Sequence, residues 1–224
     1  METLKTFRHE LKYIISYEDM LSIREKLNKV LTIDRNESGY MVRSLYFDGI
    51  NDNDYYDKLG GDIDRKKIRL RIYEPNAEKV KLELKAKYDI HQLKKSLVIN
   101  RKDAEELIKE KYDILLNYNS DVAYEIYLIL RENLYKPKII IEYNRIAYIT
   151  STTTRITFDF DIRESTNIDD FFNENINYYD LTTKKDIVLE VKFDRFLEPY
   201  ISNILSSSKA ISQSVSKYLI GRNV

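Results

Sequence analysis

Charged and apolar side chains alternate through Arg65–Lys87 (RKKIRLRIYEPNAEKVKLELKAK), the stretch of the chain best equipped for chemistry. Arg69 and Arg71 alternate with apolar residues before a Glu-Pro-Asn turn, and Glu83 and Lys85 do so after it. Alternation with a period of two on both sides of a turn predicts a β-hairpin. Its polar face would gather three cations around one carboxylate. Because cations roughly 8 Å apart repel by about 2 kcal/mol, such a face needs interleaved acids, a bound anion, or both.

A charged strand face also has an ordinary explanation, since antiparallel strands often bury one face and leave the other in water. Repetition favours a site, because most of the similar strands predicted at 7–15, 138–148, 155–161 and 187–193 also place Lys or Arg beside an acid. The acids that share strands with cations are Glu10, Glu83, Glu142, Asp159 and Glu190. These strands predict either an open sheet with a solvated charged face or a barrel with its charges inside. Periodicity does not distinguish the two.

The composition narrows the class of protein. A chain of 224 residues predicts one domain over 1–224. Lys plus Arg equals Asp plus Glu at 37 each, so no global positive field for binding nucleic acid exists. The chain has no cysteine, no apolar run of about 20 residues and no signal peptide, which predicts a soluble cytoplasmic protein without a membrane span.

The remaining segments predict the elements around these strands. Further strands are expected at 40–48 and 94–99, and the stretch 163–183 reads as a surface loop. Helices are expected at 16–30, 102–116 and 121–134, and at the C-terminus, where Ile211, Val215 and Tyr218 share a face and Gly221 is a stop signal. The segment 121–134 is apolar around so much of its circumference that it predicts deep packing or contact with another copy in a homo-oligomer. Mixed helices and strands without strict βαβ alternation predict an α+β fold with a largely antiparallel sheet.

Motifs of several familiar enzyme classes are absent. The sequence contains no GxxxxGK[ST], GxGxxG, HExxH or GxSxG. Its two histidines are far apart, and His9 is predicted to be a packed side chain rather than a base. The chemistry therefore falls to Arg, Lys and Glu residues on strand faces, and one or two of the carboxylates would suffice for Mg²⁺ or Mn²⁺ if phosphates supply other ligands.

The chain resembles the VTC domain, the polyphosphate polymerase branch of the triphosphate tunnel metalloenzymes. The resemblance rests on nine motifs in order, RHELKY, RSLYFD, RLR, LELK, KKS, IEYNR, RITFD, VLEVK and SKY. It implies an antiparallel eight-stranded β-barrel with helices packed outside and a tunnel lined by basic and acidic side chains. Arg8 stands where the related triphosphatases carry the first acid of ExExK, which places the chain nearer the VTC branch.

The resemblance also implies roles for individual residues. Those expected to act on the transferring phosphate are Arg69, Arg71, Lys85, Arg145 and Arg155. Those expected to bind the substrate are Lys12, Lys95, Lys192, Ser216 and Lys217. Glu190 is expected to hold the divalent metal, with Glu10 and Glu83 as further acids of the metal site. Ser214 departs from the family, whose polymerases carry a lysine at that position.

Three functions follow from the resemblance as expectations. The first is polyphosphate synthesis, in which ATP gives its γ-phosphoryl group to a polyphosphate chain with Mn²⁺ or Mg²⁺. The second is hydrolysis of a triphosphate at the same site, which the change at Ser214 favours. The third is a binding module for polyphosphate without turnover, which a retained Glu190 disfavours.

Overall fold

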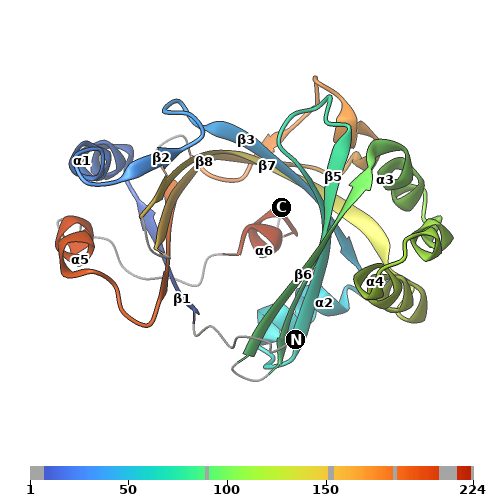
Figure 1. Cartoon of the computed structure of the whole chain (residues 1–224). Coiled ribbons are helices and arrows are strands. Elements are labelled where there is room, and N and C mark those ends of the chain that lie inside the picture. The colour runs from blue at the N-terminus through green and yellow to red at the C-terminus, as the bar shows by residue number, and fades with distance from the viewer. Residues whose placement is uncertain (1–7, 89–90, 151–153, 184–185, 207–215, 223–224) are drawn as a thin grey trace. The chain divides into compact units, whose positions relative to one another are not determined.

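The computed structural model describes residues 8–88, 91–150, 154–183, 186–206 and 216–222 (Figure 1). These residues form two compact units. The first comprises the described residues within 1–41, 143–162 and 182–216, and the second those within 42–142, 163–181 and 217–224. Each unit contains sheet strands and helices of its own. That the units act as one domain stays a prediction.

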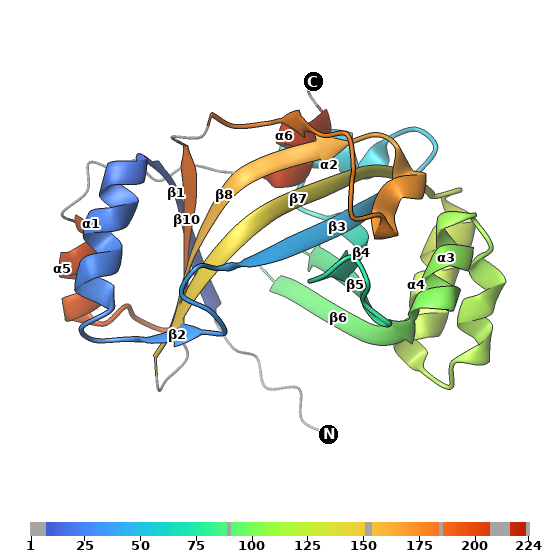
Figure 2. The same cartoon turned by 90° about the horizontal axis from the view of Figure 1, so that it is seen from above.

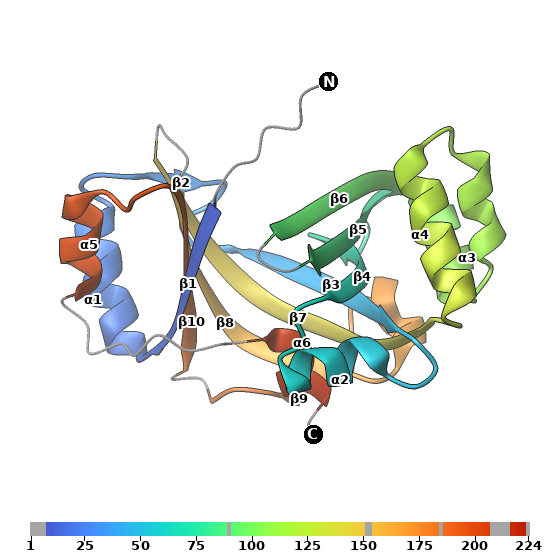
Figure 3. The ribbon, with the colours of Figure 1, turned by 90° about the horizontal axis from the view of Figure 1, so that it is seen from below.

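The first unit pairs a small sheet with two helices. Ser16 caps the first helix as predicted, because its side chain accepts a hydrogen bond from the Asp19 backbone N–H at 3.0 Å. The helices α1 and α5 lie side by side (Figures 2 and 3). The elements that contribute to this unit are β1 (Arg8–Ile15), α1 (Tyr17–Leu27), β2 (Thr32–Asp34), the later part of β7 (Lys136–Ile149), most of β8 (Arg155–Ser165), β10 (Ile187–Asp194) and α5 (Pro199–Ser206).

The second unit is built around the predicted hairpin. Its strands are most of β3 (Tyr40–Asp48), β4 (Arg65–Ile72), β5 (Lys79–Tyr88), β6 (His91–Asn100), the start of β7 and β9 (Tyr179–Asp180). Its helices are α2 (Asn53–Gly60), α3 (Arg101–Ile108), the 3₁₀ turn η1 (Tyr112–Asn117), α4 (Asp121–Glu132), the 3₁₀ turn η2 (Ile168–Phe172) and α6 (Lys217–Arg222). The short helices α2 and α6 lie side by side (Figure 3).

The strands follow the hydrogen-bonded order β1-β10-β8-β7-β3-β4-β5-β6, with β2 beside β7 and β9 beside β8. The registered pairs, including β1/β10, β10/β8, β3/β4, β4/β5 and β5/β6, are all antiparallel. The predicted α+β class with an antiparallel sheet is therefore confirmed, and eight strands lie on the main path. In the described part of the chain this path ends at β1 and β6, so the sheet is not closed.

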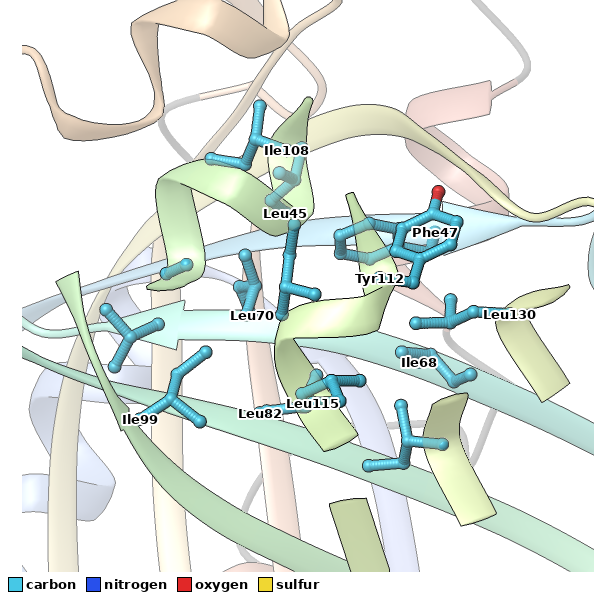
Figure 4. Close-up of a cluster of buried hydrophobic side chains, with 14 of the residues drawn as sticks. Leu45, Phe47, Ile68, Leu70, Leu82, Ile99, Ile108, Tyr112, Leu115 and Leu130 are labelled. Carbon is cyan, nitrogen blue, oxygen red and sulfur yellow. The ribbon is translucent and has the colours of Figure 1, made fainter. Parts of the chain in front are cut away.

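Alternation sends the apolar residues of each strand to the face that the helices cover. In the second unit, Leu70 of β4 and Leu82 of β5 are fully buried and belong to one core cluster with Ile108 of α3 and Leu130 of α4 (Figure 4). In the first unit, Leu189 and Phe158 pack in the same way beneath α1 and α5. Because side chains alternate along a strand, the neighbours of these residues must point to the opposite face.

Several elements differ from the sequence-based prediction. The helix expected over 102–116 ends at Ile108, because Glu110 adopts a left-handed conformation (φ 63°) and the Lys111 N–H bonds the Glu106 carbonyl at 3.0 Å. The strand β7 begins at Lys136, two residues before the predicted start at 138, and therefore includes Pro137. The strands β2 and β9, the helix α5 and the turn η2 were not predicted, and η2 and β9 interrupt the expected loop at 163–183.

Gly221 does not stop the C-terminal helix but lies within α6. A Cβ atom at this position would stand 2.7 Å from the Ile141 side chain, so glycine permits a close approach between α6 and β7. Ile211 and Val215, expected on the same helix face, lie outside the described residues. Among the described helices, none is long and apolar enough to cross a membrane.

Candidate phosphate-binding site

The hairpin and its two neighbouring strands place polar residues on one face of the second unit. We call this surface the hairpin face. Its cross-strand rungs are Tyr46–Arg69–Glu83–Ser96, Ser44–Arg71–Lys81–Val98 and Lys67–Lys85–Lys94, read from β3 or β4 to β6. Residues that oppose one another in an antiparallel pair share a face. The register therefore brings Arg69, Arg71, Lys85 and Glu83 together, as the sequence predicts.

Glu83 is the acid at the centre of the hairpin face, and its side chain is buried. Its Oε2 atom accepts a hydrogen bond from Arg69 Nε at 2.7 Å, and Arg71 Nη1 lies 3.8 Å away. Its Oε1 atom pairs with Lys94 Nζ at 2.6 Å. Burial alone would raise the pKa of Glu83, but these three cations outweigh burial and hold the pKa well below its usual range. Glu83 is therefore ionised and fully engaged.

The described rungs of the hairpin face contain more cations than carboxylates. Burial alone would raise the pKa of the Tyr46 hydroxyl, yet the positive charges of β4 lower it to about 8. A buried tyrosine with a lowered pKa indicates a strongly positive local potential. The cations that the rungs place on this face are Lys67, Arg69, Arg71, Lys81, Lys85 and Lys94. Such a surplus favours an anionic ligand that carries several charges.

A second charged surface lies on the strands of the first unit, and we call it the β10 face. Its rungs are Lys12–Glu190–Thr157 and Glu10–Lys192–Arg155, read from β1 through β10 to β8. Asp159 lies two residues beyond Thr157 on β8, so it has the same orientation. Arg145 of β7 joins this set by donating to Asp159 with two hydrogen bonds of 2.6 and 2.7 Å.

Cations and acids balance one another on the β10 face. Lys12 Nζ lies 2.6 Å from a Glu10 oxygen, and Lys192 Nζ contacts Glu190. Arg145 also approaches Glu190, at 3.8 Å. Burial alone would lower the pKa of Arg145, but the charge of Asp159 raises it well above its usual value.

Arg155 of the β10 face bonds two side chains that the sequence did not predict as site residues. Its Nη2 atom donates to Asp34 at 2.6 Å and to the Tyr40 hydroxyl at 3.2 Å. Asp34 is the acid that pairs with Arg155. The other three predicted cations of this face also have a carboxylate oxygen within 4 Å, and they are Lys12, Arg145 and Lys192. The β10 face is therefore close to neutral.

The three acids expected to hold a metal differ in their suitability. Glu10 and Glu190 are diagonal neighbours on β1 and β10, and the Thr157 hydroxyl beside Glu190 is buried and has no hydrogen-bond partner among the described residues. Two carboxylates and a hydroxyl suit a hard divalent cation that takes its remaining ligands from phosphates or water. Glu83 does not fit, because the largely buried guanidinium of Arg69 holds it through two contacts, whereas the nearest cations of Glu10 and Glu190 are partly exposed lysines. The described residues contain no group of three or more His, Cys, Asp or Glu residues that could hold a metal.

Lys95 lies on the opposite face of its strands from Arg69, Arg71 and Lys85. Its partner on β5 is Leu84, which packs in the core, and its Nζ atom pairs with Glu125 of α4 at 2.5 Å. The adjacent residue Lys94 occupies the hairpin face instead. The Lys-Lys-Ser motif alone does not show which of the two lysines lies on the hairpin face. That assignment requires the pairing register of β5 and β6.

The C-terminal residues predicted to close on the substrate lie at the start of α6. Ser216 precedes this helix, Lys217 begins it, and both side chains are partly buried. The next residue, Tyr218, is buried, donates a hydrogen bond to Asp48, and stacks on Tyr46 with ring centroids 5.2 Å apart. Tyr46 carried no signal in the sequence beyond its alternation in β3. Ser214 lies outside the described residues.

Two solved structures share this antiparallel fold. HpAC1 from Hippeastrum, a proposed adenylyl cyclase with a dominant triphosphatase activity, matches with a TM-score of 0.59 and 14% identity, covering 96% of this chain and 94% of that chain. A proposed adenylate cyclase from Vibrio parahaemolyticus matches with a TM-score of 0.51 and 12% identity, covering 96% and 97%. At these identities the likeness defines the class of fold. No curated protein matches the sequence.

The family of the chain follows from its sequence. The model of the VTC domain family matches residues 7–224, and the chain belongs to this family. The resemblance drawn from the nine ordered motifs is thereby confirmed.

Proposed function

We propose that the protein is a polyphosphate polymerase that transfers the γ-phosphoryl group of ATP to the end of a polyphosphate chain. The observation that carries this proposal is the hairpin face, whose described rungs hold six cations and one buried carboxylate, Glu83, that three of the cations contact. Membership of the VTC domain family and the shared fold support a role in handling triphosphates. A phosphate chain is a ligand with enough charge to neutralise such a face.

The hairpin face suits the charge changes of phosphoryl transfer. In this reaction the bond between the γ-phosphorus and its bridging oxygen breaks, a terminal phosphate oxygen of the acceptor bonds the same phosphorus, and ADP leaves. The acceptor is already an anion, so no side chain needs to act as a nucleophile. Arg69 and Arg71 would hold the phosphate oxygens, and Lys85 and Lys94 would add positive charge beside them. Fixed cations of this kind stabilise the charge that develops in the transition state.

The β10 face would hold the divalent metal. Glu190 and Glu10, with the Thr157 hydroxyl, are the residues whose chemistry fits Mn²⁺ or Mg²⁺. When bound, the metal supplies charge neutralisation and orients phosphate oxygens. Lys12, Lys192, Arg145 and Arg155 are the cations that would bind phosphates on this face.

Hydrolysis at the same site is the alternative function. Water would attack the γ-phosphorus in place of a phosphate chain, and the same cations would serve. The specific observation that favours hydrolysis is Ser214, because it removes a lysine that the family's polymerases carry near the end of the chain. A third candidate, a polyphosphate-binding module without turnover, predicts binding that weakens with salt and yields no product.

One incubation distinguishes these functions. Purified protein is incubated with ATP, Mn²⁺ and a short polyphosphate primer, chain length is resolved on a gel, and free phosphate is measured in parallel. A ladder of lengthening chains is the expected result. Free phosphate without a ladder would assign the site to hydrolysis, and binding of polyphosphate without either product would assign it to the binding module.

A further inference from the structure

Tyr46 is a buried tyrosine on the β3 side of the hairpin face, and the proposed phosphoryl transfer gives it no role. Only 6% of it is exposed. Its hydroxyl oxygen accepts a hydrogen bond from Arg69 Nη1 at 3.1 Å, while Arg69 Nε and Nη2 bind Glu83 at 2.7 and 2.6 Å. The guanidinium of Arg69 is thus held on one side by a carboxylate and on the other by a phenol.

The ring of Tyr46 is fixed as firmly as its hydroxyl. It stacks on Tyr218 of α6, and the Tyr218 hydroxyl donates to Asp48. Asp48 is fully buried and also accepts three backbone N–H bonds, from Gly49, Asp54 and Tyr55, at 2.7 to 3.0 Å. These contacts leave the Tyr46 ring little freedom to move. A change in the charge of the Tyr46 hydroxyl therefore acts directly on Arg69, because the ring cannot rotate away from it.

We propose that Tyr46 is a positioning residue of the hairpin face: its neutral hydroxyl orients Arg69 toward phosphate, and loss of its proton weakens the binding of triphosphates. The inference rests on the proposed function, because it takes the ligand of this face to be a phosphate chain. In the deprotonated form the oxygen becomes an anion that holds Arg69 more strongly and repels a second anion beside it. A triphosphate and a phenolate would then compete for the same positive charge.

The groups around Tyr46 favour loss of the proton at moderately alkaline pH. Cations outnumber acids, and the positive charges of β4 lower the pKa of Tyr46 to about 8 despite its burial. The titratable and charged groups that face it or its rung are Asp48 on β3, Lys67, Arg69 and Arg71 on β4, Glu83 and Lys85 on β5, Lys94 on β6 and Tyr218 on α6. Glu83 is ionised throughout this range, and burial raises the pKa of Tyr218 far above it. Of Tyr46, Glu83 and Tyr218, only Tyr46 therefore changes its charge in this pH range.

The size of the change in triphosphate affinity follows from the linkage between triphosphate binding and proton loss from Tyr46. If triphosphate binds only the form with neutral Tyr46, a pKa of about 8 makes the dissociation constant about tenfold larger at about pH 9 than at about pH 7. Reciprocity requires that bound triphosphate raise the pKa of Tyr46 by a matching amount. Two independent measurements can therefore test one inference.

The first measurement is calorimetric binding of inorganic tripolyphosphate at about pH 7 and about pH 9. Wild-type protein should lose about tenfold more affinity over this range than Tyr46→Phe. Tyr112→Phe is the matched control, because Tyr112 is also buried and also hydrogen-bonded, to the Tyr135 carbonyl at 2.5 Å, but packs in the apolar core of the second unit. It should lose affinity as the wild type does. Ionisation of tripolyphosphate itself affects all three proteins equally.

The second measurement follows phenolate absorbance of the wild type during a pH titration. One tyrosine should titrate near pH 8, and saturating tripolyphosphate should move that titration upward. This result needs no variant and so decides the matter if Tyr46→Phe does not fold. Equal pH dependence in wild type and Tyr46→Phe, or a titration that tripolyphosphate does not move, would overturn the inference and leave the proposed function intact. No binding by the wild type at about pH 7 would overturn both.

Discussion

The hairpin face and the β10 face handle their charges in opposite ways. On the described rungs of the hairpin face there are six cations and one acid, Glu83, which Arg69, Arg71 and Lys94 contact. On the β10 face, Glu10, Glu190 and Asp159 each pair with a cation of the same face, and Arg155 pairs with Asp34. Among the described residues of these rungs, cations outnumber acids on the hairpin face, whereas the β10 face has as many acids as cations.

This difference predicts different roles for the acids of the two faces. An acid that holds two arginines in place is a structural part of an anion site, and its removal should damage the fold. An acid paired with a partly exposed lysine can exchange that lysine for a metal, because the lysine can return to water at little cost. The same residue type therefore predicts a stability defect on one face and an activity defect on the other.

The largest effect is expected from Glu83→Gln. It leaves Arg69 and Arg71 as buried charges without their carboxylate, and breaking a buried pair in this way costs about 3–5 kcal/mol. The free energy of unfolding should fall by about that amount in a urea titration. Glu25→Gln is the control, since Glu25 and Lys29 form an exposed pair whose loss should cost under about 0.5 kcal/mol. A loss below about 1 kcal/mol for Glu83→Gln would contradict the role given to this acid.

The next largest effect is expected from Glu190→Gln, which should lower activity more than stability. Metal-dependent turnover should fall by at least about 100-fold, because the proposed metal site loses a carboxylate ligand. The free energy of unfolding should change less than in Glu83→Gln, since Lys192 can turn toward solvent. Asp161→Asn serves as a control, because Asp161 is exposed on β8 and bonds only the Asn144 amide in the described contacts. Full activity in Glu190→Gln would remove Glu190 from the metal site.

Arg69→Ala and Arg71→Ala should each lower the rate of phosphoryl transfer at least about tenfold, by removing a donor to the transferring phosphate. Arg69→Lys should not restore the rate, because an ammonium cannot bond Glu83 and Tyr46 in the fixed fork that a guanidinium provides. Steady-state rates at saturating ATP measure the effect. Arg101→Ala, which removes an arginine from the start of α3, should keep the wild-type rate.

The sequence predicts most of the fold because alternation and turn residues are local signals. The strand at 40–48 and the hairpin at 65–87 were predicted close to their observed limits, and the cap at Ser16 is as expected. Short elements such as β2 were missed because three residues carry too little periodicity. The end of α3 near Glu110 was missed for another reason, since no glycine marks that left-handed residue.

The candidate site was predicted less completely than the fold, because it depends on register. The alternation of charged and apolar residues along the hairpin was enough to predict that Arg69, Arg71 and Glu83 lie together. Nothing in the Lys-Lys-Ser motif shows which lysine faces the charges, and Tyr46 looks like any other aromatic residue of a strand. Such features depend on contacts between residues that are distant in sequence, for example that of Tyr46 with Tyr218.

The smallest effect comes from a pair of adjacent residues, and it tests the assignment of faces most directly. Lys94 pairs with Glu83 on the hairpin face and its side chain is about half exposed, whereas Lys95 pairs with Glu125 on the helix-covered face. Lys94→Ala should weaken tripolyphosphate binding by about two- to fivefold at low salt, the size expected for a partly exposed charge, and the difference should shrink as salt is added.

Lys95→Ala is the matched control for Lys94→Ala, since it removes the same charge one residue away. It should leave tripolyphosphate affinity unchanged and cost under about 0.5 kcal/mol in the free energy of unfolding. Calorimetry on the two variants side by side gives the comparison. If Lys95→Ala weakened binding more than Lys94→Ala, the phosphate would lie on the opposite face of β6 from Glu83, and the surplus of charge on the hairpin face would need another explanation.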